Sequence, residues 1–231
     1  MRLIFIHGFL ERETIFSHVA PALEGEKIFV NLWEMLDEKP RSALNAHDFA
    51  KEVIAKFEIV KSDVLIGHSL GGWIAYHIKS FVLCRIILIS SFTDLKKIGA
   101  PLRNAHIIYG FVGWGLKLLF PFRSMKNIFH LLNYRNTPKD LFSQAFDDIT
   151  KKENHENVIN QLKLIFENVD NQNLQPFQVP DLRIHAKRDQ IVRAPKEKFY
   201  EIPGNHFTIY TQPKTVIVPI LNFLKKEGIY A

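Results

Sequence analysis

A serine between glycines stands in the middle of the segment Asp63–Ile74, which reads DVLIGHSLGGWI. Strand-like residues precede Ser69 and a helix-compatible run begins at Leu70, so the pattern predicts a strand, a tight elbow and a helix. Gly67 and Gly71 occupy the positions where a side chain would collide with the doubling backbone. At the apex, the serine hydroxyl would be held clear of the sheet by a strained conformation. The same short pattern also arises by chance, so its context must decide its meaning.

The elements that would position this serine alternate along the first part of the chain. We expect strands at residues 3–6, 27–32, 64–67 and 85–89, and helices at 14–23, 45–57 and 70–80. Such alternation is typical of βαβ units and a parallel sheet with right-handed crossovers. After Ser91 the alternation stops, and helix-like or loop-like segments follow at residues 107–120, 125–132, 139–149 and 156–169. Strands are expected again at 180–185 and 198–202, then a helix at 211–226 that Pro219 kinks or interrupts.

Composition sets the broad class of the protein. The 231 residues are 47% hydrophobic and 23% charged, which is typical of one globular domain, here with a large insertion. The opening MRLIFIHG is too short for a secretion signal and no apolar run reaches membrane-spanning length, so we expect a cytoplasmic protein without a transmembrane segment. The single cysteine, Cys84, lies in an apolar run and is expected to be a buried, inert thiol. The net charge of +6 comes without zinc-ligand spacing or a nucleic-acid motif, so no nucleic acid is expected as a partner.

Four ordered motifs make the chain resemble the α/β-hydrolase family over nearly its whole length. They are HGF at residues 7–9, GHSLGG at 67–72, HAKRDQIV at 185–192 and IPGNHF at 202–207, and each follows a predicted strand. Serine, acid and histidine appear in the chain order that this fold requires. The resemblance implies an α/β fold with helices flanking a parallel sheet, and a serine-dependent reaction.

The resemblance also assigns roles to particular residues. A serine hydroxyl is a poor nucleophile at neutral pH, so a histidine must take its proton and a carboxylate must orient that histidine. On this basis Ser69 is the nucleophile, His206 the general base and then acid, and Asp189 the orienting acid. The developing oxyanion would be bound by the backbone N–H groups of Phe9 and Leu70.

Several of these assignments have alternatives. Asp94 follows the strand at 85–89, a position that some members of this fold use for the acid. His7 is interpreted as a packing residue that shapes the oxyanion loop, and His68 as a lining residue of the elbow. No metal or cofactor motif is present, so water alone is expected as the second substrate.

The chain departs from the family pattern in three places. It starts on the strand before the oxyanion loop, which predicts a reduced sheet of about six strands, all or nearly all parallel. Only 16 residues separate Asp189 from His206, so the helix that usually joins the last strands must be shortened or lost. The loop after the second strand begins Leu32-Trp33, so an aromatic side chain is expected near the pocket.

The insertion at residues 92–177 falls where many family members carry a helical cap, which leaves 1–91 and 178–231 as the core. From Lys96 to Lys139 it has eight Lys or Arg residues, no acidic residue and many aromatic ones. This composition fits an apolar acyl chain beneath the cap and an acidic carrier protein outside. It fits equally a cap with its own aromatic core and a solvated basic face, or a surface that docks on a membrane or a second subunit.

The function predicted from these observations is hydrolysis of a carboxylic ester or thioester of a hydrophobic acyl substrate through an acyl-enzyme. The compact size and basic cap are similar to those of esterases that cleave methyl esters of acyl chains on acyl carrier protein. Two alternatives remain: a carbon–carbon bond hydrolase or lyase with the same triad, and a non-catalytic binding protein of this fold.

Overall fold

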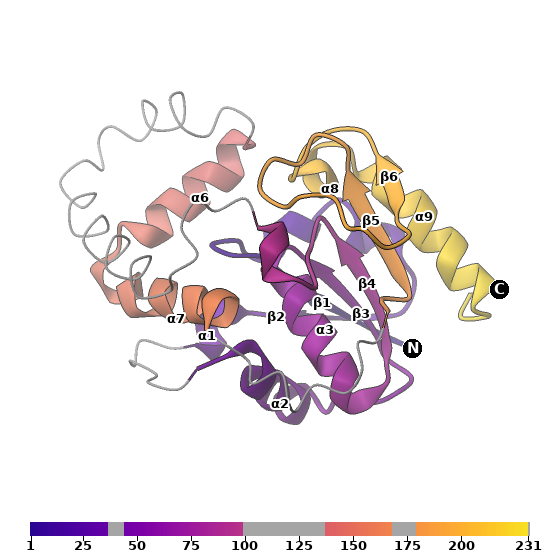
Figure 1. The fold of residues 1–231 in the computed structure, drawn as a ribbon, viewed down its shortest axis with the longest axis horizontal. Coiled ribbons are helices and arrows are strands. Elements are labelled where there is room, and N and C mark those ends of the chain that lie inside the picture. Colours follow the sequence, from indigo (N-terminus) through magenta and orange to yellow (C-terminus); the bar gives the residue numbers. More distant parts are fainter. Residues whose placement is uncertain (37–43, 99–136, 168–178, 231) are drawn as a thin grey trace.

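The computed structural model describes residues 1–36, 44–98, 137–167 and 179–230 (Figure 1). Two helical segments expected from the sequence, 107–120 and 125–132, lie outside these residues.

Within the described ranges the strands form one parallel, six-stranded sheet in the order β2-β1-β3-β4-β5-β6. This confirms the reduced parallel sheet expected from the sequence. The strands are β1 (Arg2–Ile6), β2 (Glu26–Val30), β3 (Val64–His68), β4 (Arg85–Ile89), β5 (Leu182–Ala186) and β6 (Tyr200–Ile202).

The strand order reverses between β1 and β3. The chain first moves outward from β1 to β2, then returns to place β3 on the other side of β1, where Leu3 pairs with Val64 and Ile6 with Gly67. In open α/β sheets, ligands bind at the carboxyl ends of the strands at such a switch point. The loop after β1 and the elbow after β3 are therefore neighbours at the place where a site is expected.

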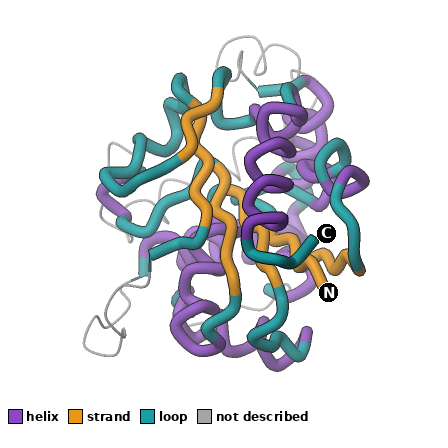
Figure 2. Tube along the Cα trace, turned by 90° about the vertical axis from the view of Figure 1, so that its right-hand side faces the viewer, coloured by secondary structure: helices purple, strands orange, loops and turns teal. Residues whose placement is uncertain are grey.

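Helices cover both faces of the sheet because successive side chains of a strand point to opposite faces (Figure 2). Ile4 packs in one apolar cluster with α2 (Ala46–Phe57) and α3 (Leu70–Val82), whereas Phe5 packs in another with α9 (Pro213–Lys226). Both strand residues are fully buried. The two clusters fix the sheet rigidly and so position the loops at its carboxyl edge.

The remaining helical elements are short or belong to the insertion. Between β4 and β5 lie α6 and α7, which Figure 1 shows together on one side of the sheet, with α7 beside α1. None of the helices in the described part of the chain is long and apolar enough to cross a membrane. The bounds are α1 (Leu32–Met35), α6 (Lys139–Ile149), α7 (His155–Phe166) and α8 (Thr208–Thr211), with short turns η3 (Leu95–Lys97) and η5 (Lys152–Asn154).

The prediction of a helix at residues 14–23 is wrong. The structure has two short 3₁₀ turns instead, η1 (Glu13–Phe16) and η2 (Ala20–Ala22), and Pro21 lies in the second. A proline inside a helix disfavours its continuation, because it lacks the N–H and its ring clashes with the preceding turn. The apolar spacing reflects burial of residues such as Phe16 rather than helical periodicity.

The terminal helix was expected to be kinked or interrupted at Pro219. It is not interrupted, because α9 runs through the proline. Val216, Ile220 and Leu224 on either side of the proline are fully buried in the second apolar cluster. A proline inside a helix costs about 3 kcal/mol, and burial of three large side chains at about 1.5–3 kcal/mol each outweighs that cost. Residues 187–199 between β5 and β6 carry no helix, as the short spacing predicted.

Candidate active site

Ser69 occupies the predicted elbow between β3 and α3. Its backbone has φ 52° and ψ −120°, a conformation that residues other than glycine rarely adopt. A serine at a helix N-terminus usually caps it through its hydroxyl, but the Ser69 side chain makes no capping bond to α3. The hydroxyl is therefore not engaged by its own helix, as a nucleophile requires.

Close contacts around the elbow exclude side chains at two glycines. A Cβ on Gly67 would lie 2.4 Å from the Cα of Gly72, and a Cβ on Gly8 would lie 2.9 Å from the Cβ of Ser69. The loop after β1 thus passes directly against the serine. Glycine is required at both positions because only it leaves room for this approach.

His206 and Asp189 meet although they follow different strands. The Nδ1 of His206 lies 2.8 Å from Oδ2 of Asp189, and the Asp189 side chain is inaccessible to solvent. The other carboxylate oxygen accepts the N–H groups of Ile191 and Val192 at 2.9 Å each. Burial opposes ionisation of Asp189, but the hydrogen bond and charge of His206 and the backbone N–H donor outweigh it, so its pKa lies below the usual value.

The competing acid, Asp94, is placed elsewhere. It is exposed, and its carboxylate accepts the N–H of Lys96 at 2.9 Å at the start of η3. The structure therefore brings Asp189, and not Asp94, to His206.

Hydrogen bonds from His7 and Glu11 fix the carbonyl group of Gly8 in the loop after β1. His7 is buried, and its Nε2 accepts the N–H of Leu32 at 3.1 Å, so the proton of the neutral ring is on Nδ1. That Nδ1–H donates to the carbonyl of Gly8 at 2.9 Å, and the N–H of Glu11 approaches the same oxygen at 3.3 Å. Burial lowers the pKa of His7 to about 4, which keeps this neutral form at physiological pH.

The orientation of the Gly8 carbonyl determines that of the next N–H. In a trans peptide the N–H points opposite to the C=O, so the Phe9 N–H faces away from His7. The N–H of Leu70 opens α3, where the first N–H groups of a helix have no partner within it and carry positive partial charge. The two predicted oxyanion donors thus come from neighbouring segments that both border Ser69.

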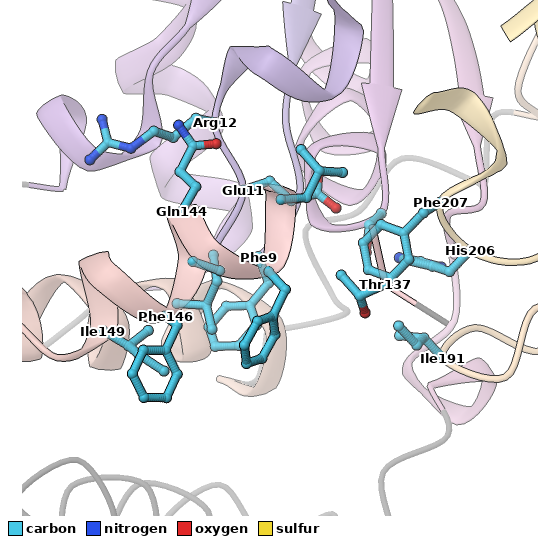
Figure 3. Close-up of a pocket in the computed structure, with 15 residues that line it drawn as sticks. Phe9, Glu11, Arg12, Thr137, Gln144, Phe146, Ile149, Ile191, His206 and Phe207 are labelled. Carbon is cyan, nitrogen blue, oxygen red and sulfur yellow. The ribbon is translucent and has the colours of Figure 1, made fainter. Parts of the chain in front are cut away.

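A cavity of about 390 Å³ opens at Ser69 and His206. Figure 3 shows its apolar side chains on either side of the space, with Phe9, Phe146 and Ile149 at one end and His206, Phe207 and Ile191 at the other. Six lining residues belong to α6, and the sequence analysis did not single them out because their apolar spacing is that of any amphipathic helix. They are Leu141, Phe142, Gln144, Ala145, Phe146 and Ile149.

Trp33 lies near this cavity but does not line it. It packs with Phe9, Leu10 and Val158, and its indole N–H donates to the carbonyl of Glu11 at 2.8 Å. The aromatic residue expected near the pocket therefore supports the loop after β1 from behind.

One group in the described ranges has donors that a metal ion could use. Donor atoms of Glu11, His68 and His206 lie within 4.8 Å of one another. Both ring nitrogens of His68 already contact oxygen atoms of the protein, and His206 uses Nδ1 for Asp189. A metal would have to displace these bonds, so we assign the group to the protein's own hydrogen-bond network. The sequence analysis missed Glu11, whose only signal is a carboxylate four residues after His7.

Comparison with known proteins identifies the family of the chain. The model of the alpha/beta hydrolase family matches residues 3–217, and the chain therefore belongs to the α/β-hydrolase family. A comparison with curated protein sequences found no significant match.

Many solved structures share the fold. A putative aryl esterase from Burkholderia cenocepacia superposes with a TM-score of 0.69 at 16% identity, covering 97% of this chain and 90% of that one. An esterase from Thermogutta terrifontis gives 0.65 at 18% identity, covering 98% and 90%. The meta-cleavage product hydrolase from Pseudomonas fluorescens gives 0.62 at 12% identity, covering 98% and 91%. Identities this low show only a shared fold, and proteins that share a fold can cleave different bonds.

Proposed function

We propose that this protein is a serine hydrolase that cleaves a carboxylic ester or thioester of a hydrophobic acyl substrate through an acyl-enzyme intermediate. The observation that carries the proposal is the meeting of three groups: Ser69 and His206 open on one cavity, and His206 is bound by the buried carboxylate of Asp189. Membership of the α/β-hydrolase family supports hydrolytic activity.

In this mechanism the Ser69 hydroxyl attacks the substrate carbonyl while Nε2 of His206 takes its proton. Asp189 keeps the His206 proton on Nδ1 and stabilises the imidazolium that forms. The negative charge on the tetrahedral oxygen is bound by the N–H groups of Phe9 and Leu70. Collapse expels the alcohol or thiol, which His206 protonates, and water then releases the acid by the same steps in reverse.

The lining of the cavity supports a hydrophobic acyl group. Leu141, Phe142, Phe146 and Ile149 bring apolar side chains from α6 over the serine. We propose that residues 92–177, to which α6 belongs, form a cap on the core of residues 1–91 and 178–231. The volume lies near the lower end of the range of about 300–1,000 Å³ for ligand sites, which favours a small or medium acyl group.

The first experiment uses p-nitrophenyl esters of increasing chain length with the wild-type protein and with Ser69→Ala. The wild type should hydrolyse them, and a fluorophosphonate should label Ser69. The Ser69→Ala protein should remain folded, lose hydrolysis and escape labelling. If the wild type hydrolyses none of the esters and is not labelled, the proposal is wrong.

A second experiment tests whether the acyl group occupies the cavity beneath α6. Ile149→Trp should fill the end that lies far from His206 in Figure 3 and shift the preferred ester to shorter chains. Labelling by a small fluorophosphonate should be unchanged. The control Lys139→Trp alters an exposed residue of the same helix that does not line the cavity, so the preferred chain length should stay the same.

The proposal of an acidic carrier protein depends on the basic segment from Lys96 to Lys139, most of which lies outside the described residues. Added salt screens charge attraction between proteins. Rising salt should therefore weaken turnover of a carrier-bound acyl substrate more than that of a small neutral ester. Equal sensitivity of the two substrates would count against the carrier.

A further inference from the structure

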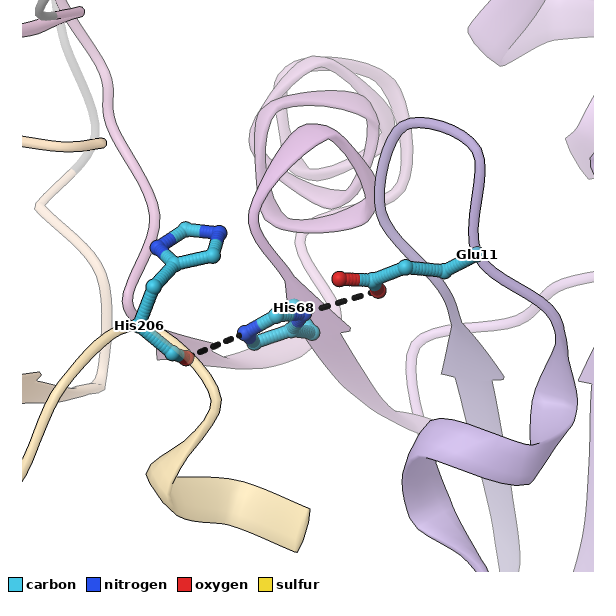
Figure 4. Close-up of side chains that lie close together, drawn as sticks. All are labelled: Glu11, His68 and His206. Carbon is cyan, nitrogen blue, oxygen red and sulfur yellow. Dashed lines mark hydrogen bonds and ion pairs between the residues drawn. The ribbon is translucent and has the colours of Figure 1, made fainter. Parts of the chain in front are cut away.

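His68, the residue before the elbow serine, joins two loops of the site. Its side chain is fully buried, with Nδ1 2.8 Å from Oε2 of Glu11 and Nε2 3.0 Å from the carbonyl oxygen of His206 (Figure 4). The His68 and His206 rings lie 4.8 Å apart between centroids. The histidine thus reaches the loop after β1 with one nitrogen and the backbone of the proposed base with the other.

Both neighbours of the His68 ring are hydrogen-bond acceptors. A neutral imidazole has one N–H, so it would turn a lone pair toward one of the two oxygen atoms, whereas an imidazolium donates to both. The charge is balanced by Glu11, whose side chain is 10% exposed. Burial lowers the pKa of His68, but the charge and hydrogen bond of Glu11 outweigh it and the pKa is raised. For Glu11 the signs are reversed: burial raises its pKa, but His68 and the other partners lower it by more, so the pKa of Glu11 is lowered overall.

A single carboxylate oxygen of Glu11 carries two bonds. Oε2 accepts from His68 Nδ1 and also from the N–H of Gly8, at 2.7 Å. The Gly8 N–H is one residue before the Phe9 N–H, the proposed oxyanion donor. Through this oxygen, the position of the oxyanion loop depends on the same ring that holds the His206 backbone.

We propose that the Glu11–His68 ion pair is a positioning pair, which sets the separation between the oxyanion loop and His206 on either side of Ser69. The inference rests on the proposed serine hydrolase function. It goes beyond the triad and the oxyanion donors, because neither residue touches the reacting atoms. Four titratable side chains interact electrostatically with His68 or its partner, namely His7, Glu11, Asp189 and His206.

Glu11→Gln is the sharpest variant because it keeps the shape of the side chain. If the amide oxygen takes the place of Oε2, it accepts both bonds but leaves the buried imidazolium without a counter-charge. If the amide nitrogen takes that place, it cannot accept the Gly8 N–H. We expect kcat to fall about 10- to 100-fold with KM unchanged, which is less than the loss of about 10²–10³ on removing an oxyanion donor outright.

Asp63→Asn is the matched control. Asp63 is also a buried carboxylate that pairs with a cation, Arg2, and accepts a backbone N–H, that of Val60, but it stands just before β3, at the end of that strand remote from Ser69. This substitution should lower the unfolding midpoint without lowering kcat. An equal fall of kcat in both variants would mean that Glu11 acts only through general stability, and would overturn the proposal.

The protonation of His68 can be measured in the wild type, so the test does not depend on a variant folding. Nitrogen-15 NMR of histidine-labelled protein at neutral pH should show both ring nitrogens of one buried histidine protonated, and His68→Asn should remove those signals. A neutral His68 ring would overturn the ion pair.

A double-mutant cycle completes the test. Glu11→Gln with His68→Asn removes both charges, so the double variant should lose less kcat than the two single losses predict together. Additive losses would mean that the residues act independently. The proposed function is checked separately by fluorophosphonate labelling of the wild type. Without labelling or hydrolysis the function fails and the pair has no catalytic role; an active, labelled wild type with undiminished kcat in Glu11→Gln refutes the pair alone.

Discussion

The carbonyl oxygen of Ile6 lies where a side chain on Gly71 would have to stand. A Cβ built on Gly71 would be 1.9 Å from that oxygen, far inside any contact distance. The end of β1 therefore packs directly against the first turn of α3, and this contact brings the loop after β1 beside Ser69. Backbone cannot move aside as the tip of a side chain can.

Ordinary overpacking of a protein core costs about 1–3 kcal/mol. Gly71→Ala should lower the free energy of unfolding by more than this, because the added methyl group would meet backbone. The measurement is urea unfolding, followed by fluorophosphonate labelling of any folded protein. Gly228→Ala is the control: it meets no atom within 4 Å and carries only the cost of a positive φ, about 1–2 kcal/mol. Equal stability of the two variants would show that the elbow tolerates a side chain.

Asp189→Asn should lower kcat by about 10⁴-fold while leaving the protein folded, because an amide no longer holds His206 in the productive tautomer. Asp94→Asn should leave kcat unchanged, since Asp94 is exposed and bonds to the backbone of Lys96. Steady-state rates on one p-nitrophenyl ester compare the two. A fully active Asp189→Asn enzyme would contradict the assignment of the acid.

Arg12 and Asp148 join the loop after β1 to α6. The guanidinium donates from Nε to Oδ2 at 2.7 Å and from Nη2 to Oδ1 at 2.9 Å, and the Asp148 side chain is 4% exposed. Arg12→Ala should lower the free energy of unfolding by about 3 kcal/mol, because it leaves a buried carboxylate without its main partner. Lys51→Ala, which breaks the exposed pair with Asp48, should cost less than about 1 kcal/mol. Similar losses in chemical denaturation would argue against this link.

Stability should fall as the pH drops from 6.5 toward 4. Burial lowers the pKa of His7 from 6.5 to about 4 and that of His77 to about 3. In this interval the two histidines bind protons in the unfolded chain but not in the folded protein. Each of them therefore lowers the free energy of unfolding as the pH falls, and His7 alone lowers it by about 3 kcal/mol. His68 has the opposite sign, because its raised pKa makes its contribution greatest below the unfolded value of 6.5.

His77→Phe tests this pH dependence. Neither ring nitrogen of His77 has a hydrogen-bond partner in the described part of the chain, and the ring packs edge-on against Trp73 at 4.2 Å between centroids. Phenylalanine keeps an aromatic ring there and cannot be protonated. Unfolding free energies measured across the interval should change less with pH than those of the wild type. An identical slope would show that His77 does not contribute.

The sequence by itself determined the elements that depend on neighbouring residues. The apolar run of the buried strand β1, the helix that starts after Asn45 and the glycines around Ser69 were all predicted, because the local composition, local sterics and local hydrogen bonds decide them. The order of serine, acid and histidine was also readable, since each follows a strand of a parallel sheet. Local rules failed near Pro21 and at Pro219. At residues 14–23 the apolar spacing came from burial and not from a helix, and two short 3₁₀ turns form there. At Pro219 the packing of α9 outweighs the cost of the proline, so the helix continues.

Only the tertiary structure decided which distant side chains meet. Glu11 and His68 are 57 residues apart, Arg12 and Asp148 are 136 apart, and no periodicity connects either pair. The sequence assigned the acid to Asp189 with Asp94 as the alternative, and the fold decides where each carboxylate lies: Asp189 meets His206, whereas Asp94 is exposed. The apolar face of α6 became a cavity lining because α6 is placed over the carboxyl edge of the sheet. Such contacts are set by the packing of whole elements, which a linear pattern does not encode.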